Sequence, residues 1–178
     1  MKEKESISIF DTNIFLTGID FNLFKGTIYT TPKIISEINV KKYRNQNRNI
    51  FTKIQAAINS KKLFIRHPQE EYILKVEEKS KLTGDYKALS IADKEVIALS
   101  LELKESLNER VRLYTNDYSM ENLCSELNIP FSPIHKKGIK SRIIWEIYCP
   151  FCNDTRKSED LYKNCGVCGQ KLKRRPKK

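Results

Sequence analysis

The sequence predicts an α/β protein in which helices sandwich a parallel sheet, followed by a small C-terminal metal-binding ribbon. Short apolar stretches alternate along the chain with segments whose apolar residues recur at helical spacing. Two C-x2-C pairs lie near the C-terminus. Strands that alternate with helices are typical of a parallel sheet covered on both faces. Paired cysteines at this spacing are typical of a zinc ribbon.

The first half of the chain begins with a buried strand. Ser6–Phe10 is a short isoleucine-rich run that ends at an aspartate, and Gly26–Thr31 is a second strand-like run. Pro32 is acceptable in the first turn of a helix, and Lys33–Val40 continues with apolar residues at helical spacing. The polar, basic stretch Lys41–Asn49 is expected to be a loop or a frayed helix end. A helix over Ile50–Ile58 and a strand over Lys62–Arg66 follow.

In the second half the strongest helix is Leu89–Leu103, which has a broad apolar surface and Ser90 as a candidate cap. The expected elements around it are a helix over Glu70–Leu82, a strand over Val111–Thr115, a helix over Asp117–Leu127, a short strand within Asn128–Ser132 and a strand over Ile143–Tyr148. The last stretch, Lys171–Lys178, is so charged that we expect a mobile tail.

The four paired cysteines predict a structural zinc site. Cys149, Cys152, Cys165 and Cys168 form two pairs with twelve residues between them. Four thiolates complete a tetrahedron around Zn2+ and leave no open position. So short a module cannot bury a sufficient core, so the metal would supply much of its folding free energy. A redox dithiol or iron is the alternative. The fifth cysteine, Cys124, lies on a predicted helix and is expected to be a small buried apolar residue.

The formal net charge is +11, and Cys149–Lys178 holds nine Lys and Arg against three Asp and Glu. Such a balance favours a polyanionic partner, most often nucleic acid, with solubility alone as the alternative. No apolar run approaches the roughly 20 residues that span a membrane, and the charged N-terminus is unlike a signal peptide. We therefore expect a cytoplasmic protein without a membrane partner.

Four carboxylates fall where the predicted sheet would gather them. They are Asp11 after the first strand, Glu37 and Asp93 on helices, and Asp117 after the strand RLYT. Ligands of open parallel sheets bind beyond the carboxyl ends of the strands. Converging carboxylates repel unless a cation joins them, and Mg2+ and Mn2+ prefer oxygen ligands. This is the chemistry of a metal-dependent nuclease. The short polar side chains suited to hydrogen-bonding these acids are Thr12, Asn13, Thr115 and Asn116.

Each acid also has a simpler interpretation. Asp93 can complete a capping box with Ser90, Asp117 can cap a helix, and Glu37 can be a solvated helix residue. Asp11 is harder to explain in this way, because an aspartate that ends an apolar strand needs a partner.

At these residues the sequence resembles the PIN-domain nucleases. Their ordered acids are matched by Asp11 in FDTN, Glu37 in PKIISEI, Asp93 in LSIADKEVIAL and Asp117 in YTNDYSM. Together with the linking stretch GIKSRIIWEIY and the cysteine ribbon, the chain looks like the archaeal Nob (Nin-one-binding) endonucleases over about Ile7 to Gln170. One departure is Asn13, where many PIN domains have serine or threonine.

The resemblance implies a PIN-like nuclease domain over 1–135, a linker with an entering strand over 136–148, a zinc ribbon over 149–170 and a basic tail over 171–178. It also implies an endoribonuclease that trims the 3′ end of the small-subunit (16S-type) rRNA precursor and leaves 5′-phosphate and 3′-hydroxyl ends. Mn2+ or Mg2+ would be held by Asp11, Asp93 and Asp117, with Glu37 as a fourth catalytic acid. The partners would be precursor rRNA in the small ribosomal subunit precursor and other assembly factors.

Candidate phosphate contacts lie in the ribbon and the tail: Lys163, Lys171, Lys173, Arg174 and Arg175. Tyr162 could stack on a base or pack in the ribbon's small core. Lys41, Lys42, Arg44 and Arg48 would either extend the basic track or belong to a solvated loop.

Three other functions can be weighed against the sequence. A PIN-type toxin ribonuclease acting on tRNA or mRNA shares the acids, but such toxins resemble a PIN domain without a ribbon. A non-catalytic RNA-binding assembly factor would not need all four acids. A zinc-ribbon DNA-binding regulator is more distant, since nothing resembles a recognition helix.

Overall fold

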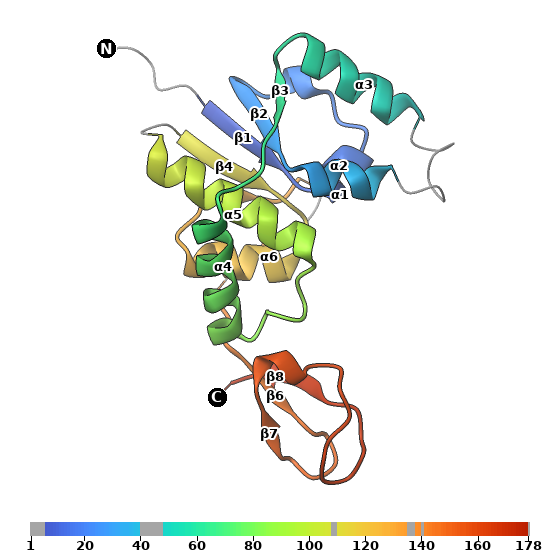
Figure 1. Cartoon of the computed structure of the whole chain (residues 1–178), viewed down its shortest axis with the longest axis vertical. Coiled ribbons are helices and arrows are strands. Elements are labelled where there is room, and N and C mark those ends of the chain that lie inside the picture. The colour runs from blue at the N-terminus through green and yellow to red at the C-terminus, as the bar shows by residue number, and fades with distance from the viewer. Residues whose placement is uncertain (1–5, 40–47, 108–109, 135–137, 140, 178) are drawn as a thin grey trace.

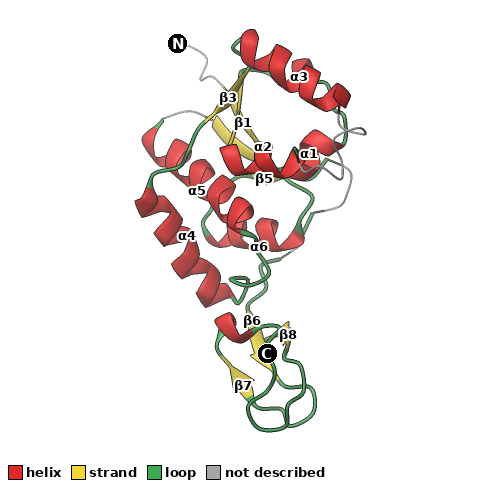
Figure 2. Cartoon of the chain, turned by 45° about the vertical axis from the view of Figure 1, so that its right-hand side comes forward, coloured by secondary structure: helices red, strands yellow, loops and turns green. Residues whose placement is uncertain are grey.

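The computed structural model describes residues 6–39, 48–107, 110–134, 138–139 and 141–177. A larger α/β domain occupies one end of the molecule, and the C-terminal ribbon of short strands and loops lies at the other end of the long axis, below α4 and α6 (Figures 1 and 2). In the part of the chain that is described, no helix is both long enough and apolar enough to span a membrane.

The larger domain is built on a parallel sheet, as predicted. Its strands are β1 (Ser6–Phe10), β2 (Thr27–Thr30), β3 (Leu63–Ile65), β4 (Arg110–Tyr114) and β5 (Phe131–Ser132). They are hydrogen-bonded in the order β3-β2-β1-β4-β5, and every pair is parallel. The central strand β1 buries Ile7, Ile9 and Phe10 completely or nearly so, which explains its continuous apolar sequence.

The helices cover the sheet and lie close to their predicted positions, apart from the short helix after the first strand, which was not predicted. They are α1 (Thr12–Leu16), α2 (Pro32–Ile38), α3 (Arg48–Asn59), α4 (Glu70–Thr83), α5 (Ile91–Ser106) and α6 (Tyr118–Glu126). The strongest predicted helix is α5, which packs on β1 and β4 and against α2, α4 and α6. Most of the predicted basic loop, residues 41–47, lies outside the described residues.

The ribbon is a second, antiparallel sheet. Its strands β6 (Trp145–Tyr148), β7 (Thr155–Arg156) and β8 (Lys173–Pro176) are ordered β7-β6-β8. A short 3-10 helix, η3 (Ser158–Asp160), also belongs to it. Its core consists of Ile147, Leu161 and Leu172 together with Cys149 and Cys165.

The prediction of a mobile basic tail from Lys171 is wrong. The strand β8 pairs with β6 from Trp145↔Pro176 to Tyr148↔Lys173. Charge density predicted disorder, but Arg174 and Arg175 are each paired with a carboxylate, Asp85 and Glu146. The boundary predicted at residue 170 therefore falls inside the sheet of the ribbon.

The ribbon is docked on the loop between α4 and α5. Gly84 ends α4 in a left-handed conformation (φ 78°), and a Cβ atom there would lie 2.4 Å from the carbonyl oxygen of Trp145. Only glycine tolerates both the conformation and this close approach. Ala88 in the same loop packs against the ribbon's core. The end of α4 is thus shaped to receive the first ribbon strand.

Candidate active site and metal centre

The predicted acids meet at the carboxyl end of the central strands. Asp11 directly follows β1, and Thr115–Asp117 follows β4, the neighbouring strand. The Asp11 amide donates a hydrogen bond to the carbonyl oxygen of Tyr114 (3.3 Å). The strand order reverses direction between β1 and β4, which is where ligands bind in open α/β sheets.

Asp11 is the most enclosed of the four acids, with 2% of its surface exposed. Its carboxylate accepts hydrogen bonds from the Thr12 amide (2.6 Å), the Thr115 hydroxyl (3.0 Å) and the Asn13 side-chain amide (3.3 Å). Three of the four short polar residues predicted to assist the acids therefore contact Asp11. The fourth, Asn116, accepts a hydrogen bond from the Ile134 amide (3.0 Å).

The aspartates also influence one another electrostatically. The pKa of Asp11 is raised to about 6, chiefly by burial and then by repulsion from Asp93, with a smaller repulsion from Asp117; the Thr115 and Thr12 hydrogen bonds act in the opposite direction. Burial likewise raises the pKa of Asp93, with Asp117 contributing. Three carboxylates that resist joint ionisation in this way form the arrangement that a divalent cation stabilises.

Asp93 and Asp117 both cap helices, as their simpler interpretations held. The Ser90 amide donates to Asp93 Oδ2 (2.7 Å) and the Asp93 amide to Ser90 Oγ (3.1 Å), which completes the capping box of α5. The Ser119 amide donates to Asp117 Oδ1 (2.6 Å) at the start of α6. Each of these cap bonds occupies one carboxylate oxygen, so capping is compatible with metal ligation by the other.

Glu37 reaches the group from α2. It is half-buried, and the Thr12 hydroxyl donates a hydrogen bond to its Oε2 (2.6 Å). Because Thr12 is the residue after Asp11, this hydrogen bond holds Glu37 close to the Asp11 segment. Thr115 provides a second link, since its hydroxyl donates to Asp11 and accepts from the Asp117 amide (3.1 Å).

The four paired cysteines converge in the ribbon as predicted, and their sulfur atoms all lie within 4.8 Å of one another. The shorter separations are 3.3 Å for Cys149–Cys168, 3.6 Å for Cys152–Cys165 and 3.8 Å for Cys152–Cys168. A tetrahedron with Zn–S bonds of about 2.3 Å needs sulfur atoms about 3.8 Å apart, whereas a disulfide needs about 2 Å. The site therefore fits a tetrahedral metal ion. Within the described residues, no acid cluster is as tight.

Backbone amides favour the ligating form of the sulfur in Cys149 and Cys165, whereas in Cys152 and Cys168 burial and the neighbouring sulfur atoms outweigh the backbone amides and raise the pKa. The amides of Cys168 and Val167 lower the pKa of Cys165 to about 6. The pKa of Cys149 is lowered chiefly by the Cys152 amide. Thiolates are the form that binds zinc. The remaining cysteine, Cys124, is fully buried on α6, as predicted.

The candidate RNA contacts fall into two groups. Lys171 and Lys173 are exposed, and Lys163 is exposed beside Asp160 (2.8 Å). In contrast, Arg174 and Arg175 are held in intramolecular ion pairs. Tyr162 is 57% exposed, so the alternative that it packs in the ribbon's core is wrong.

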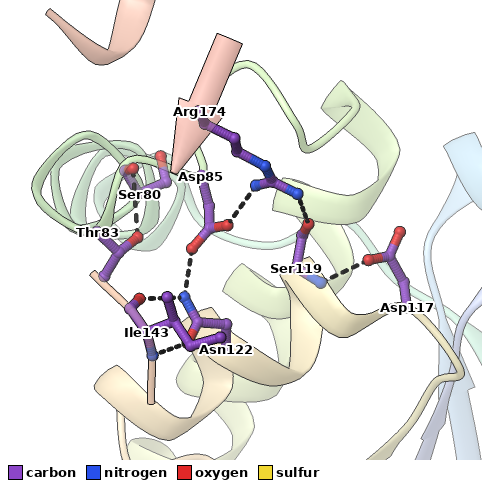
Figure 3. Close-up of polar contacts among 8 residues, drawn as sticks. All are labelled: Ser80, Thr83, Asp85, Asp117, Ser119, Asn122, Ile143 and Arg174. Atoms are coloured by element: carbon purple, nitrogen blue, oxygen red, sulfur yellow. Dashed lines mark hydrogen bonds and ion pairs between the residues drawn. The ribbon is translucent and has the colours of Figure 1, made fainter. Parts of the chain in front are cut away.

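Sequence reasoning missed a polar network that joins the ribbon to α6 (Figure 3). Arg174 donates hydrogen bonds to Asp85 (2.9 Å) and to the Ser119 hydroxyl (3.2 Å). The Asn122 side chain donates to Asp85 (2.6 Å). Asp85 follows a helix-ending glycine rather than a strand, so no pattern marks it. In the sequence, the one indication that Arg174 is partly buried was its i, i+2 spacing from Leu172, which places both side chains on the same face of a strand.

A second missed feature is a group of lysines around one ring. The ammonium groups of Lys94, Lys81 and Lys87 lie 3.7, 5.0 and 5.7 Å from the centre of the Tyr86 ring. Lys94 is buried, and burial is the main reason that its pKa is lowered. These lysines are scattered in the sequence and resemble ordinary solvated residues.

Residues 8–103 match the family model described as the PIN domain of ribonuclease. Over 169 residues the chain is 33% identical to a Methanocaldococcus jannaschii protein named endoribonuclease Nob1, covering 95% of this chain and 77% of the relative. A Thermoplasma acidophilum protein named ribonuclease VapC1 is 30% identical over 94% of this chain and 77% of its own length. A shorter match, 39% identical over 85 residues, covers 48% of this chain and 17% of a Saccharomyces cerevisiae protein named 20S-pre-rRNA D-site endonuclease NOB1.

Proposed function

The chain belongs to the PIN-domain ribonucleases and, among them, to the family of the Nob1 endoribonucleases, and we propose that it is the metal-dependent endoribonuclease that matures the 3′ end of the small-subunit rRNA precursor. Endoribonuclease activity and a role in rRNA processing follow from the family. The metal dependence, the 3′ end and the residue roles below are our proposal.

The observation that carries the proposal is the environment of Asp11. This carboxylate is buried at the reversal point of the sheet, and both burial and the neighbouring Asp93 and Asp117 make its ionisation costly. A protein retains such a costly arrangement where the charge has a function. A divalent cation would neutralise the repulsion among these carboxylates and would also attract an RNA phosphate to the site.

Asp11, Asp93 and Asp117 would hold Mn2+ or Mg2+, and Glu37 would assist from α2 through Thr12. The bound ion would neutralise charge on the phosphodiester and activate a water molecule, leaving 5′-phosphate and 3′-hydroxyl ends. The chain's own contribution is positioning. Thr115 orients the Asp11 and Asp117 segments relative to each other, and the capping bonds fix Asp93 and Asp117 at helix starts.

In this proposal the ribbon holds a structural Zn2+ on Cys149, Cys152, Cys165 and Cys168 and helps to bind RNA. Lys163, Lys171 and Lys173 are the exposed phosphate contacts, and Tyr162 offers an exposed ring for stacking. The partner is precursor rRNA in the small-subunit precursor, with other assembly factors nearby, in the cytoplasm. We place the ribbon unit at 145–176, so that β6 and β8 belong to it.

The relative named VapC1 raises the alternative of another RNA substrate. Its match covers 94% of this chain and so includes ribbon residues. It therefore does not point to a PIN domain without a ribbon. A purely RNA-binding factor would gain nothing from the cost of burying Asp11.

The decisive experiment maps cleavage ends on small-subunit precursor rRNA, tRNA and mRNA, each with and without Mn2+. We expect one Mn2+-dependent cut at the 3′ end of the small-subunit rRNA and none in the Asp11→Asn variant. Preferred cutting of tRNA or mRNA, or equal cutting by the variant, would contradict the proposal.

A further inference from the structure

A pocket of about 320 Å3 opens between the first turn of α6 and the ribbon. The residues that matter in its lining are Tyr118, Ser119, Ile143, Trp145 and Arg174. It adjoins the acidic site, because Tyr118 directly follows Asp117 and the Ser119 amide donates to the Asp117 carboxylate (2.6 Å). A group held in this pocket would therefore lie next to the acids.

The walls of the pocket are held in place by the network in Figure 3. Arg174 spans Asp85 and Ser119 through two hydrogen bonds. Asn122 fixes the opposite side, since it accepts from the Ile143 amide (2.7 Å), donates to the Ile143 carbonyl (2.8 Å) and donates to Asp85 (2.6 Å). Because these polar groups already bind one another, the pocket is preformed, and its recognition rests mainly on its apolar and aromatic surfaces.

The chemistry of these surfaces matches a nucleobase. Trp145 supplies an aromatic wall backed by the Arg174 guanidinium, 4.5 Å from the ring centre. Tyr118 at the mouth is 53% exposed. Aromatic rings and guanidinium planes are the surfaces on which proteins stack the unpaired bases of RNA. The Arg174 guanidinium would not stabilise a bound apolar protein side chain. The net charge of +11 also favours a nucleic acid at this position.

We propose that this pocket takes one unstacked nucleobase of the RNA, from a nucleotide next to the bond cleaved at the acidic site. The inference rests on the proposed endoribonuclease function and deepens it by assigning a base-recognition subsite. In it Tyr118 and Trp145 provide stacking surfaces, and Arg174 fixes the orientation of Trp145.

Trp145 makes the test direct, because it is the chain's single tryptophan. The full chain carrying Asp11→Asn is titrated with a short RNA that spans the mapped cleavage site. Tryptophan fluorescence and affinity are compared with those for RNAs carrying one abasic nucleotide at each flanking position in turn. We expect one abasic position to remove most of the fluorescence change and to weaken binding about tenfold, while abasic positions farther away have little effect.

The protein side of the test uses Tyr118. Combined with Asp11→Asn, Tyr118→Ala should lose the preference for the intact RNA over the critical abasic RNA, whereas Tyr118→Phe, which keeps the ring, should retain it. Leu74→Ala is the matched control, because Leu74 is similarly exposed (59%) but lies on α4 outside the pocket. Zinc content and the unfolding midpoint verify that each variant is folded.

The possible results distinguish a failure of the base-binding inference from a failure of the proposed endoribonuclease function. If every abasic RNA gives the same fluorescence and affinity as the intact RNA, the pocket holds no base and the inference is wrong. If RNA never changes the fluorescence, the pocket serves another occupant, such as a protein side chain, and the inference is again wrong. Cleavage by the wild-type protein is mapped on the same RNA, so a failure of the proposed function shows as the absence of any specific cut.

Discussion

Arg174, in the last strand of the ribbon, donates a hydrogen bond of 2.9 Å to Asp85, a fully buried carboxylate in the larger domain. Asp85 also accepts from Asn122. Even so, burial raises the pKa of Asp85, because it outweighs the hydrogen bonds from Asn122 and Thr83 and the attraction of Arg174. The pair therefore fixes the geometry between ribbon and domain rather than adding much net stability.

Removing Arg174 should accordingly be more damaging than removing the pair. Arg174→Ala leaves a buried charge without its cation and is expected to lower the free energy of unfolding by about 3 kcal/mol. Arg174→Ala combined with Asp85→Asn should recover part of that loss, because the buried charge is gone. Urea unfolding of the zinc-loaded proteins measures both. A double variant less stable than Arg174→Ala would show that the carboxylate contributes by itself.

The same variant has a predicted pH dependence. In the folded state Asp85 has a raised pKa, so its ionisation costs stability as the pH rises through that pKa. Arg174→Ala raises the pKa further. The difference in the free energy of unfolding between the wild-type protein and Arg174→Ala should therefore be largest at pH 7 or above and should narrow as the pH falls and Asp85 becomes protonated. A difference that widens on acidification would contradict this.

Asp11→Asn should abolish cleavage and yet stabilise the protein in the absence of added Mn2+ or Mg2+. The pKa of Asp11 is raised from 3.8 to about 6. Relative to its state at higher pH, the protonated carboxyl stabilises the folded protein below pH 3.8, and this contribution to the free energy of unfolding is lost as the pH rises through about 6. At pH 7 the ionised carboxylate costs up to about 3 kcal/mol. We expect the asparagine variant to be more stable at pH 7 by about 1–3 kcal/mol and to show no advantage at pH 4. Thermal unfolding at the two pH values measures this, and a loss of stability at pH 7 would contradict it.

Thr115 links Asp11 to Asp117 through two hydrogen bonds, so Thr115→Val should weaken the catalytic metal site without removing a ligand. Loss of a hydrogen bond that orients a metal ligand costs roughly 10–100-fold in metal affinity or activity. We expect the Mn2+ concentration for half-maximal cleavage to rise by that factor. Thr17→Val is the control, since the Thr17 hydroxyl donates to the Ile14 carbonyl instead. Equal Mn2+ requirements in the two variants would exclude this role for Thr115.

Much of the fold could be predicted because the secondary structure that the local sequence favours is also the one that packing in the folded protein requires. The isoleucine-rich β1 and the capped, apolar α5 each have a single compatible structure, and the C-x2-C turns determine the ribbon. The proximity of the acids could be predicted because Asp11 directly follows β1 and Asp117 comes shortly after β4, and a parallel sheet brings these strand ends to one edge. The sequence alone does not decide whether Asp93 and Asp117 cap helices or bind metal, and the structure shows that the caps exist.

What failed depended on contacts between segments distant in sequence. The stretch from Lys171 appeared too charged to fold, because its partners Asp85 and Glu146 lie in other elements. Asp85 itself stands after Gly84 in a loop, where burial of a carboxylate has no local signature. Composition indicates that a charge must be neutralised, but only the fold shows which side chain neutralises it.

The structure separates the basic residues of the C-terminus by their effect on RNA binding. Lys171→Ala together with Lys173→Ala removes two exposed ammonium groups and should reduce the dependence of log affinity on log salt by about 1.4 for single-stranded RNA. Arg175→Ala should change the slope little, because Arg175 is bound to Glu146 (2.8 Å) and lies 4.2 Å from the Tyr148 ring centre. Affinities from 50 to 300 mM salt measure this. A reduction of about 0.7 in the slope for Arg175→Ala would show that the ion pair opens on binding.

Loss of the zinc site should affect both units, because Arg174 belongs to the ribbon. Cys165→Ser with Cys168→Ser is expected to remove the bound zinc, unfold the ribbon and weaken RNA binding. Unfolding of β8 withdraws Arg174 from Asp85, so the larger domain should also lose about as much stability as in Arg174→Ala.

A cycle of variants isolates this coupling. Adding Arg174→Ala to the double cysteine variant should then cost the larger domain almost nothing, since the contact is already lost. Cys124→Ala is the control, because that buried cysteine lies on α6 and should leave the zinc content unchanged. If the cysteine and arginine substitutions lowered the unfolding free energy additively, the ion pair would not be the link between the ribbon and the domain. Unchanged zinc content in the double cysteine variant would instead contradict the assignment of these cysteines as zinc ligands.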